Sequence, residues 1–342
     1  MDPGDRRSLG RTGLPVPTLG FGCAPLGNMY AEFDDEQARA TVRTAFDLGL
    51  RLFDTAPLYG HGLAEHRLGE ALRWQPRDSY LLSTKVGRLL RPRDPATVDG
   101  GLFKRVLPFE GVYDYSYDGV MRSFEDSLQR LGTWRVDILL VHDVDVWTHG
   151  SEEARRQRFR EVMEGGYRAL LELREAGVIR AIGAGVNEVE ACEAFARAGD
   201  FDCFLLAGRY TLLEQGALDS LLPLCAEKGI SLLIGGPYNT GILATGARPD
   251  AWYNYAPAPP EIRDRVRRIE TVCAEFDVPL PAAALQFPLG HPNVASVVPG
   301  GRTPEEVRRN RALFSTPIPA PFWQALKDRG LLRGDAPVPA GG

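Results

Sequence analysis

The sequence predicts an α/β protein folded as one (β/α)8 barrel, and three observations support this fold class. Short runs rich in leucine, isoleucine and valine alternate eight times with longer segments whose apolar residues recur at helical spacing, which indicates parallel strands joined by helices. A length of 342 residues suits a single barrel. No Gly-x-Gly-x-x-Gly turn follows the first strand, which disfavours the alternative of an open, doubly wound sheet.

Eight strands are predicted from the short apolar runs. Leucine and β-branched residues dominate these runs, as they do in buried strands. The predicted strands cover residues 18–22, 51–54, 80–85, 136–141, 178–183, 203–206, 231–234 and 294–298.

Eight helices are predicted to follow the strands in turn. Gly49, Gly132, Gly177 and Gly229 each stand just past the last apolar residue of a predicted helix, where a left-handed C-cap costs little only for glycine. The predicted helices cover residues 35–48, 63–73, 117–131, 160–176, 189–198, 216–228, 261–275 and 304–313.

Three connections are longer than the fold requires, at residues 87–116, 143–159 and 241–260. Long loops in a compact domain are usually functional, and in a barrel the loops after the strands form the mouth of the active site. Neutral surface insertions are the alternative. The aromatic residues of the third loop, Trp252, Tyr253 and Tyr255, favour a functional role.

The composition limits the class of protein. It is 44% hydrophobic and 25% charged, and its net charge of -5 arises from 40 basic and 45 acidic residues spread along the chain, so nucleic acid is not an expected partner. The first 14 residues are polar, and no later run reaches the about 18 apolar residues of a membrane span, so neither a signal peptide nor membrane insertion is expected. We expect one domain over residues 1–342, with loose ends at about 1–10 and 333–342.

The cysteine pattern indicates a reducing compartment. The five cysteines are odd in number, lie far apart and form no Cys-x-x-Cys pair, which argues against both disulfides and a zinc site. We therefore expect a cytoplasmic protein without a metal. Nothing in these residues indicates an oligomeric state.

Four polar residues stand at or just after adjacent predicted strand ends: Asp54, Tyr59, Lys85 and His142. Barrels place catalytic groups at such positions. Taken singly, Asp54 is equally a turn cap, Lys85 a solvated side chain and His142 a hydrogen-bonded structural histidine.

Together, these residues suggest a mechanism of proton transfer. Lowering a phenol pKa from about 10 to about 7 requires about 4 kcal/mol, which a close ammonium group can supply in a partly desolvated pocket. The carboxylate of Asp54 would keep Lys85 charged and oriented, and His142 would position the reacting oxygen. Tyr59 is thereby predicted to be the proton-transfer residue.

Motifs over nearly the whole chain resemble the aldo-keto reductases. They are GFG at 20–22, FDTAPLYG at 53–60, STKV at 83–86, LLVH at 139–142, GAGVN at 183–187 and VPGGR at 298–302, with Asn310. The resemblance implies a nicotinamide-binding barrel in which Asp54, Tyr59, Lys85 and His142 form the catalytic tetrad. Tyr59 would be its general acid or base.

Within that family, GRYTLL at 208–213, DYSY at 114–117 and NYAP at 254–257 are similar to the aldose dehydrogenase branch, which includes L-fucose and pyridoxal 4-dehydrogenases. The branch oxidises cyclic hemiacetals to lactones. The resemblance therefore implies oxidation of an aldose at C1, with Tyr59 taking the proton and the cofactor accepting hydride. Pyridoxal oxidation, NADPH-dependent reduction of aldehydes or ketones, and a non-catalytic nicotinamide-binding subunit are the alternatives.

The resemblance also implies a set of cofactor contacts. Three positions depart from the family pattern, because Val186, Ala207 and Gly235 replace its serine, glutamine and nicotinamide-stacking tyrosine. The expected contacts are Gly22, Cys23, Asp54, Asn187, Gly236, Tyr238, Thr240, Gly300, Arg302, Glu306 and Asn310.

The expected cofactor is NAD or NADP, and we favour NAD. Gly300 and Glu306 occupy positions that are lysine and arginine in many NADP-dependent relatives, and the carboxylate of Glu306 would repel a 2′-phosphate. The guanidinium of Arg302 favours the opposite choice. Five aromatic side chains are candidates for stacking on a sugar or pyridine ring, with packing of the loops as the alternative: Tyr115, Tyr117, Trp147, Trp252 and Tyr255.

Overall fold

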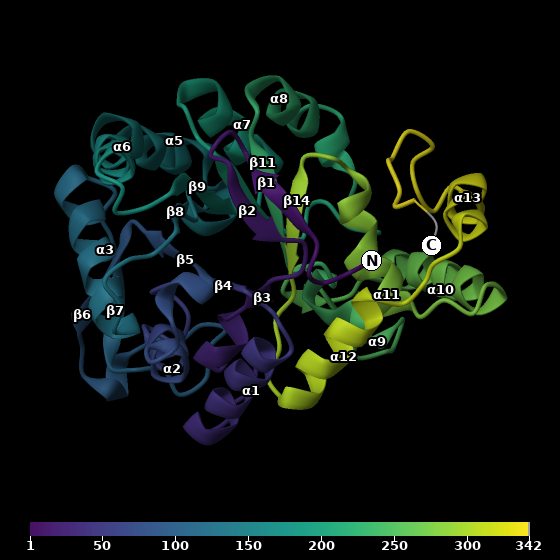
Figure 1. Cartoon of the computed structure of the whole chain (residues 1–342), viewed down its shortest axis with the longest axis horizontal. Helices are drawn as coiled ribbons and strands as arrows, with labels where there is room; N and C mark the ends of the chain where they lie inside the picture. Colours follow the sequence, from purple (N-terminus) through teal and green to yellow (C-terminus); the bar gives the residue numbers. More distant parts are fainter. Residues whose placement is uncertain (341–342) are drawn as a thin grey trace.

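A computed structural model of the chain describes residues 1–340 and confirms the predicted (β/α)8 barrel. Eight parallel strands pair in the order β14-β11-β10-β9-β8-β5-β4-β3, and helices surround them (Figure 1). Bridges of Leu19 with Val297 and of Gly22 with Gly300 join the first strand to the last. The sheet is therefore closed into a barrel.

The barrel strands follow the predicted runs closely. Their bounds are β3 Phe21–Gly22, β4 Leu52–Asp54, β5 Leu81–Val86, β8 Ile138–His142, β9 Ala181–Val186, β10 Cys203–Ala207, β11 Ser231–Gly235 and β14 Val294–Val298. Three antiparallel hairpins lie outside the barrel: β1 Arg6–Leu9 with β2 Leu14–Pro17, β6 Arg88–Pro92 with β7 Phe109–Tyr113, and β12 Trp252–Tyr253 with β13 Ala256–Pro257.

The helices include the eight predicted ones and several that were not predicted. Their bounds are α1 Asp35–Asp47, α2 Leu63–Leu72, α3 Tyr117–Leu131, α4 Val146–His149, α5 Glu152–Glu161, α6 Tyr167–Glu175, α7 Val189–Ala198, α8 Leu221–Lys228, α9 Ile242–Thr245, α10 Pro260–Glu275, α11 Leu280–Gln286, α12 Pro304–Phe314 and α13 Ala320–Asp328. A π-helical turn, Val162–Gly166, joins α5 to α6. None of the described helices is both long and apolar enough to cross a bilayer.

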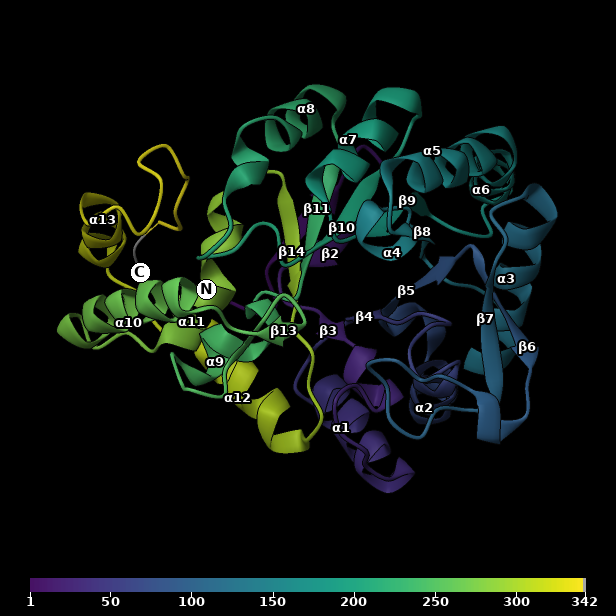
Figure 2. The same ribbon diagram turned by 180° about the vertical axis from the view of Figure 1, so that it is seen from behind.

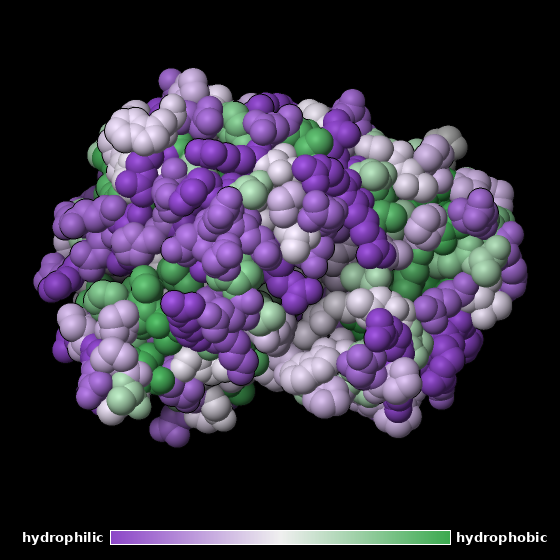
Figure 3. Space-filling view, turned by 90° about the horizontal axis from the view of Figure 1, so that it is seen from below, coloured by the Kyte–Doolittle hydropathy of each residue, from purple (hydrophilic) through white to green (hydrophobic). Residues whose placement is uncertain are grey.

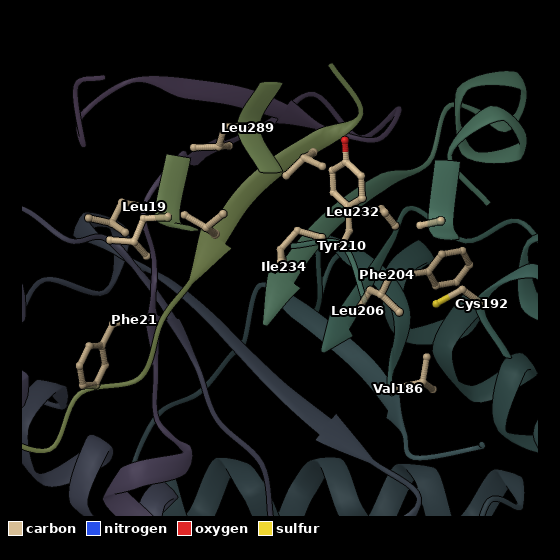
Figure 4. Packing of buried hydrophobic residues seen from close by; sticks show 14 of the residues in the cluster. Leu19, Phe21, Val186, Cys192, Phe204, Leu206, Tyr210, Leu232, Ile234 and Leu289 are labelled. Atoms are coloured by element: carbon tan, nitrogen blue, oxygen red, sulfur yellow. The ribbon is translucent and has the colours of Figure 1, made fainter. Parts of the chain in front are cut away.

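Side chains alternate between two apolar clusters along each barrel strand, as the pleat of a strand requires. Phe204, Leu206, Leu232 and Ile234 belong to the layer between the barrel and its helices (Figure 4). The residues that fill the barrel interior share the other parity and include Leu52, Leu81, Ile138, Leu140, Ala181, Cys203, Leu205 and Leu233.

The N-terminal hairpin closes one end of the barrel. Leu9, Leu14 and Val16 join the interior cluster, and Figure 1 looks onto this end. The expectation of a loose segment at residues 1–10 is therefore wrong for β1. Buried Ala336 contradicts looseness over part of 333–342, and residues 341–342 of that segment lie outside the described residues.

The seventh helix of the ring is α11, although the sequence predicted the segment now seen as α10. Helix α11 is buried along its length and packs on α12, whereas α10 packs on α13 outside the ring (Figure 1). The polar face of α10 explains its position, because only Val266, Ile269, Val272 and Cys273 are buried. The alanine-rich α11 carries too weak an apolar pattern to be recognised from sequence.

Candidate active site

Three of the four predicted catalytic residues are the last inward positions of their strands. Strand alternation places Asp54 inward after Leu52, Lys85 after Leu81, and His142 after Leu140. Because these strands are parallel, the three side chains meet at one end of the barrel. That end faces the viewer in Figure 2, beside α4, α9 and β13.

Lys85 forms a buried ion pair at the centre of this group. Its Nζ donates to Asp54 Oδ2 at 2.7 Å and to the Thr55 carbonyl at 2.8 Å, and Asp54 Oδ1 accepts from Ser83 Oγ at 2.8 Å. A Cβ at Gly185 would stand 3.1 Å from Lys85 Cε. The glycine, on β9 and thus on the far side of β8 from β5, therefore leaves the space that the lysine fills.

Tyr59 lies in the turn after β4 and faces the other three residues. Lys85 Nζ is 4.9 Å from the centre of its ring, and the ring of His142 stands edge-on with centroids 6.0 Å apart. Phe103 covers the ring from another side, at 6.0 Å between centroids. The structure thus brings the four residues together.

Lys85 and His142 differ in charge at neutral pH. Burial lowers the pKa of Lys85, but its interactions with Asp54 and Tyr59, led by the negative charge of Asp54, raise it by more, so the amine stays an ammonium. Burial, with the charges of Lys85 and Arg88, holds the pKa of His142 well below its usual range, so its ring is neutral.

The expected near-neutral pKa of Tyr59 is not found. Burial raises the pKa of its phenol, and the charge of Lys85 only partly opposes that rise. The physical reason is that the ammonium is already paired with Asp54 at 2.7 Å, whereas the phenol packs against the apolar ring of Phe103. Tyr59 is therefore a protonated phenol at neutral pH.

A cavity of about 860 Å³ opens beside Tyr59 and extends to the start of α12. Most of the expected cofactor residues line it, namely Gly22, Cys23, Asp54, Gly236, Tyr238, Thr240, Gly300, Arg302 and Glu306. Asn310 stands behind this wall, accepting from the Tyr238 hydroxyl at 2.8 Å. Asn187 is also set back, bonded to Asp145 and, at 3.2 Å, to the Tyr255 hydroxyl.

The cavity fits a dinucleotide in shape and charge. The backbone of Gly236 is left-handed, with φ at 54°, and Gly235 presents no side chain, so backbone groups border the cavity directly. Four cationic side chains also line it: Lys104, Arg209, Arg248 and Arg302. Such charges suit a pyrophosphate. Within residues 1–340 no cluster of His, Cys, Asp or Glu is placed to hold a metal.

Aromatic side chains surround the mouth, as the sequence suggested for most of them. Trp252 packs against Tyr30 with centroids 6.0 Å apart, and Trp147 packs against Tyr255 at 5.8 Å. Tyr115 is instead a buried support, since its hydroxyl donates to the His142 carbonyl at 2.7 Å. The suggestion that Tyr117 lies at the mouth is wrong, because its hydroxyl donates a hydrogen bond to Glu172 on α6, one of the outer helices.

Four residues that border the site were not predicted from the sequence: Tyr30, Phe103, Asp143 and Arg209. Phe103 comes from the loop between β6 and β7, which was predicted only as a long connection. Asp143 directly follows the predicted His142, and this adjacency was the one available signal.

Comparisons with known proteins agree with this architecture. The family model described as "Aldo/keto reductase family" matches residues 18–329. The chain is 45% identical to pyridoxal 4-dehydrogenase of Microbacterium luteolum over 96% of its length and 98% of that protein's. It is 39% identical to a D-threo-aldose 1-dehydrogenase of a Pseudomonas species, covering 94% of this chain and 96% of the other.

The fold also has a solved counterpart. The holo form of an aldo-keto reductase from Bacillus halodurans superposes with a TM-score of 0.74 and 25% identity, covering 97% of both chains. The fold and the site together define the class of protein, an oxidoreductase barrel that uses a nicotinamide cofactor. The chain belongs to the aldo/keto reductase family and is an NAD(P)-dependent oxidoreductase.

Proposed function

We propose that this protein oxidises the cyclic hemiacetal of an aldose at C1 to a lactone, with Tyr59 as the proton-transfer residue. The observation that carries the proposal is the position of Tyr59, beside Lys85 and His142 at the end of a cavity of dinucleotide size. The similarity to a D-threo-aldose 1-dehydrogenase supports the substrate class.

The roles of the four residues follow from their contacts. Tyr59 Oη takes the proton of the hemiacetal hydroxyl, and the ammonium of Lys85 stabilises the phenolate from which the reaction starts. Asp54 keeps Lys85 charged, while the neutral ring of His142 orients the substrate oxygen. When bound, an oxidised nicotinamide accepts the hydride.

Two other substrates have specific support. Pyridoxal is favoured by the 45% identity to pyridoxal 4-dehydrogenase, and it too forms a cyclic hemiacetal. Reduction of an aldehyde is favoured by the protonated state of Tyr59, because that direction needs a proton donor.

The contacts of Glu306 support NAD as the preferred cofactor. Its carboxylate accepts from the Arg302 backbone N–H at 2.8 Å and from Arg302 Nη2 at 3.2 Å. The guanidinium that would hold a 2′-phosphate is therefore already paired, and the carboxylate beside it would repel such a group.

The chain is also proposed to work as one domain in the cytoplasm. Its five cysteines are free and buried, which suits a reducing compartment. We propose a small molecule as its partner.

The test is an activity screen with NAD and NADP against L-fucose, D-arabinose, L-galactose, pyridoxal and simple aldehydes. Tyr59→Phe should lower kcat by about 10²- to 10⁴-fold while the Kd for NAD stays within about threefold, because the lost hydroxyl moves the proton. Phe103→Leu is the matched control for altered packing around the ring. Full turnover by Tyr59→Phe would refute the mechanism.

A further inference from the structure

Asp143 has an unusual backbone and an unusual position. It follows the last inward residue of β8 and adopts a left-handed conformation with φ at 56°. This conformation costs a non-glycine residue about 1 to 2 kcal/mol. Strain of this kind is commonly retained where it aims a side chain at a functional site. Here it places Asp143 Oδ1 3.4 Å from His142 Nε2.

Arg88 holds one oxygen of this carboxylate. Its Nη2 donates to Asp143 Oδ2 at 3.1 Å and to the Tyr113 hydroxyl at 2.9 Å, and its guanidinium lies 4.7 Å from the centre of the Tyr113 ring. Both Arg88 and Tyr113 belong to the β6–β7 hairpin. The hairpin thus fixes the orientation of Asp143.

The other oxygen is free to bind a ligand. Among residues 1–340, Asp143 Oδ1 accepts no hydrogen bond, and the side chain keeps 10% of its surface exposed beside His142. No group in the described part of the chain donates to this oxygen and solvent can still reach it, so it is available as an acceptor to a partner from outside the chain.

The groups around Asp143 show which way it faces. Its nearest neighbour in the site is His142, 3.4 Å away, and the ring of His142 in turn faces the ring of Tyr59 with centroids 6.0 Å apart, so the carboxylate stands beside the group of four residues. Burial raises the pKa of Asp143 itself to about 6; Arg88 and Lys85 oppose this rise and Asp145 adds to it. The carboxylate predominates at neutral pH and is a strong acceptor.

We propose that Asp143, oriented by Arg88, accepts a hydrogen bond from a substrate hydroxyl next to the hemiacetal carbon and so selects hydroxylated substrates. The inference rests on the proposed oxidation and adds a specificity-determining residue to it. In an aldose this is the 2-hydroxyl, on the carbon bonded to C1; in pyridoxal the corresponding group is the ring 3-hydroxyl, one carbon further from the hemiacetal carbon. A site built to bond a hydroxyl rejects an analogue that lacks it, because the acceptor stays unpaired.

The experiment compares each substrate with its deoxy analogue: L-fucose with 2-deoxy-L-fucose, and pyridoxal with 3-deoxypyridoxal. Wild-type protein should prefer the hydroxylated member of one pair by about 100-fold or more in kcat/KM, and the pair that shows this identifies the source. In Asp143→Asn the amide oxygen can still accept from Arg88, which turns the NH₂ toward the substrate. The preference should then fall below about tenfold, through loss of activity on the hydroxylated member.

The ratio of the two kcat/KM values within a pair distinguishes this role from a merely structural one, because misfolding lowers activity on both members alike. The intrinsic difference in reactivity between the two members is the same for variant and wild-type protein, so it cancels when their ratios are compared. Asp118→Asn, exposed on α3, is the matched control and should keep the wild-type ratio. Quenching of protein fluorescence by NAD reports folding. If Asp143→Asn does not fold, Asp143→Ser, which also removes the carboxylate, replaces it.

An unchanged ratio in a folded Asp143 variant would overturn the role of Asp143 alone. Wild-type protein that oxidises neither pyridoxal nor any aldose of the screen would overturn the proposed function and this inference together.

Discussion

Lys85 brings a positive charge close to Tyr59, the phenol that we propose transfers the proton. Its ammonium is shared between Asp54 and the Thr55 carbonyl, and it stands 4.9 Å from the ring centre of Tyr59. The charge lowers the pKa of Tyr59, but burial raises it by more. The phenol is thus the resting form, and the fraction of phenolate grows as pH rises.

The two directions of the reaction should therefore respond differently to pH. We expect kcat/KM for oxidation to rise from about pH 7 to about pH 10, because oxidation needs deprotonated Tyr59, whereas kcat/KM for reduction should stay nearly constant, because the raised pKa keeps Tyr59 protonated over this range. His142 stays neutral throughout, since its pKa is lowered. Lys85→Met should move the rise to higher pH. Steady-state profiles in both directions test this, and an oxidation rate that falls with pH would contradict it.

Glu306 should decide between the two nicotinamide cofactors. Glu306→Gln removes a negative charge and weakens the pair with Arg302 Nη2, so Arg302 and the N-terminus of α12 become available to a 2′-phosphate. We expect kcat/KM with NADP relative to NAD to rise about tenfold, which corresponds to about 1.4 kcal/mol. Adding Arg302→Ala should abolish this gain. An unchanged ratio in Glu306→Gln would remove the proposed basis for NAD preference.

The elements that were predicted from sequence are those with a strong local pattern. Each barrel strand is an apolar run, so the strand ends that carry Asp54, Lys85 and His142 could be placed, and their convergence followed from the parallel fold. The β6–β7 hairpin could not be placed, because a long polar loop without a recognisable turn separates its strands. Asp143 was missed for the same reason, since its contact with Arg88 exists only once that hairpin is formed.

The β12–β13 hairpin should slow the release of cofactor. Its turn residues Asn254 and Tyr255 both have positive φ, and Trp252 packs on Tyr30 from the loop after β3. All four border the cavity, so the hairpin reaches across it.

Trp252→Ala removes this contact between the two loops. Aromatic pairs contribute about 0.5 to 1.5 kcal/mol, so the Kd for NAD should rise about two- to tenfold through faster dissociation. Stopped-flow fluorescence measures the rate. Trp74→Ala, at the exposed end of α2 and away from the cavity, is the control. Equal dissociation rates in both variants would contradict a closing role for the hairpin.

The two ends of the barrel have different roles, since one stabilises the fold and the other holds the proposed active site. The hairpin β1–β2 closes one end, where Arg7 donates to the carbonyls of Leu289, His291 and Val294, and the proposed site occupies the other. Polar residues cover much of the side seen in Figure 3, with apolar residues in separate patches. The interior cluster lies between the two ends and is shared by both.

Leu9→Ala should therefore lower stability without altering catalysis. Leu9 is fully buried in the interior cluster, and truncating such a side chain costs about 2 to 5 kcal/mol, partly through the cavity it leaves. Urea denaturation measures the loss, with Ser8→Ala as an exposed control in the same strand. The kcat/KM of the folded variant should stay within about twofold, because distant sites act independently. A fall in kcat/KM at full stability would instead show that the two ends of the barrel are coupled.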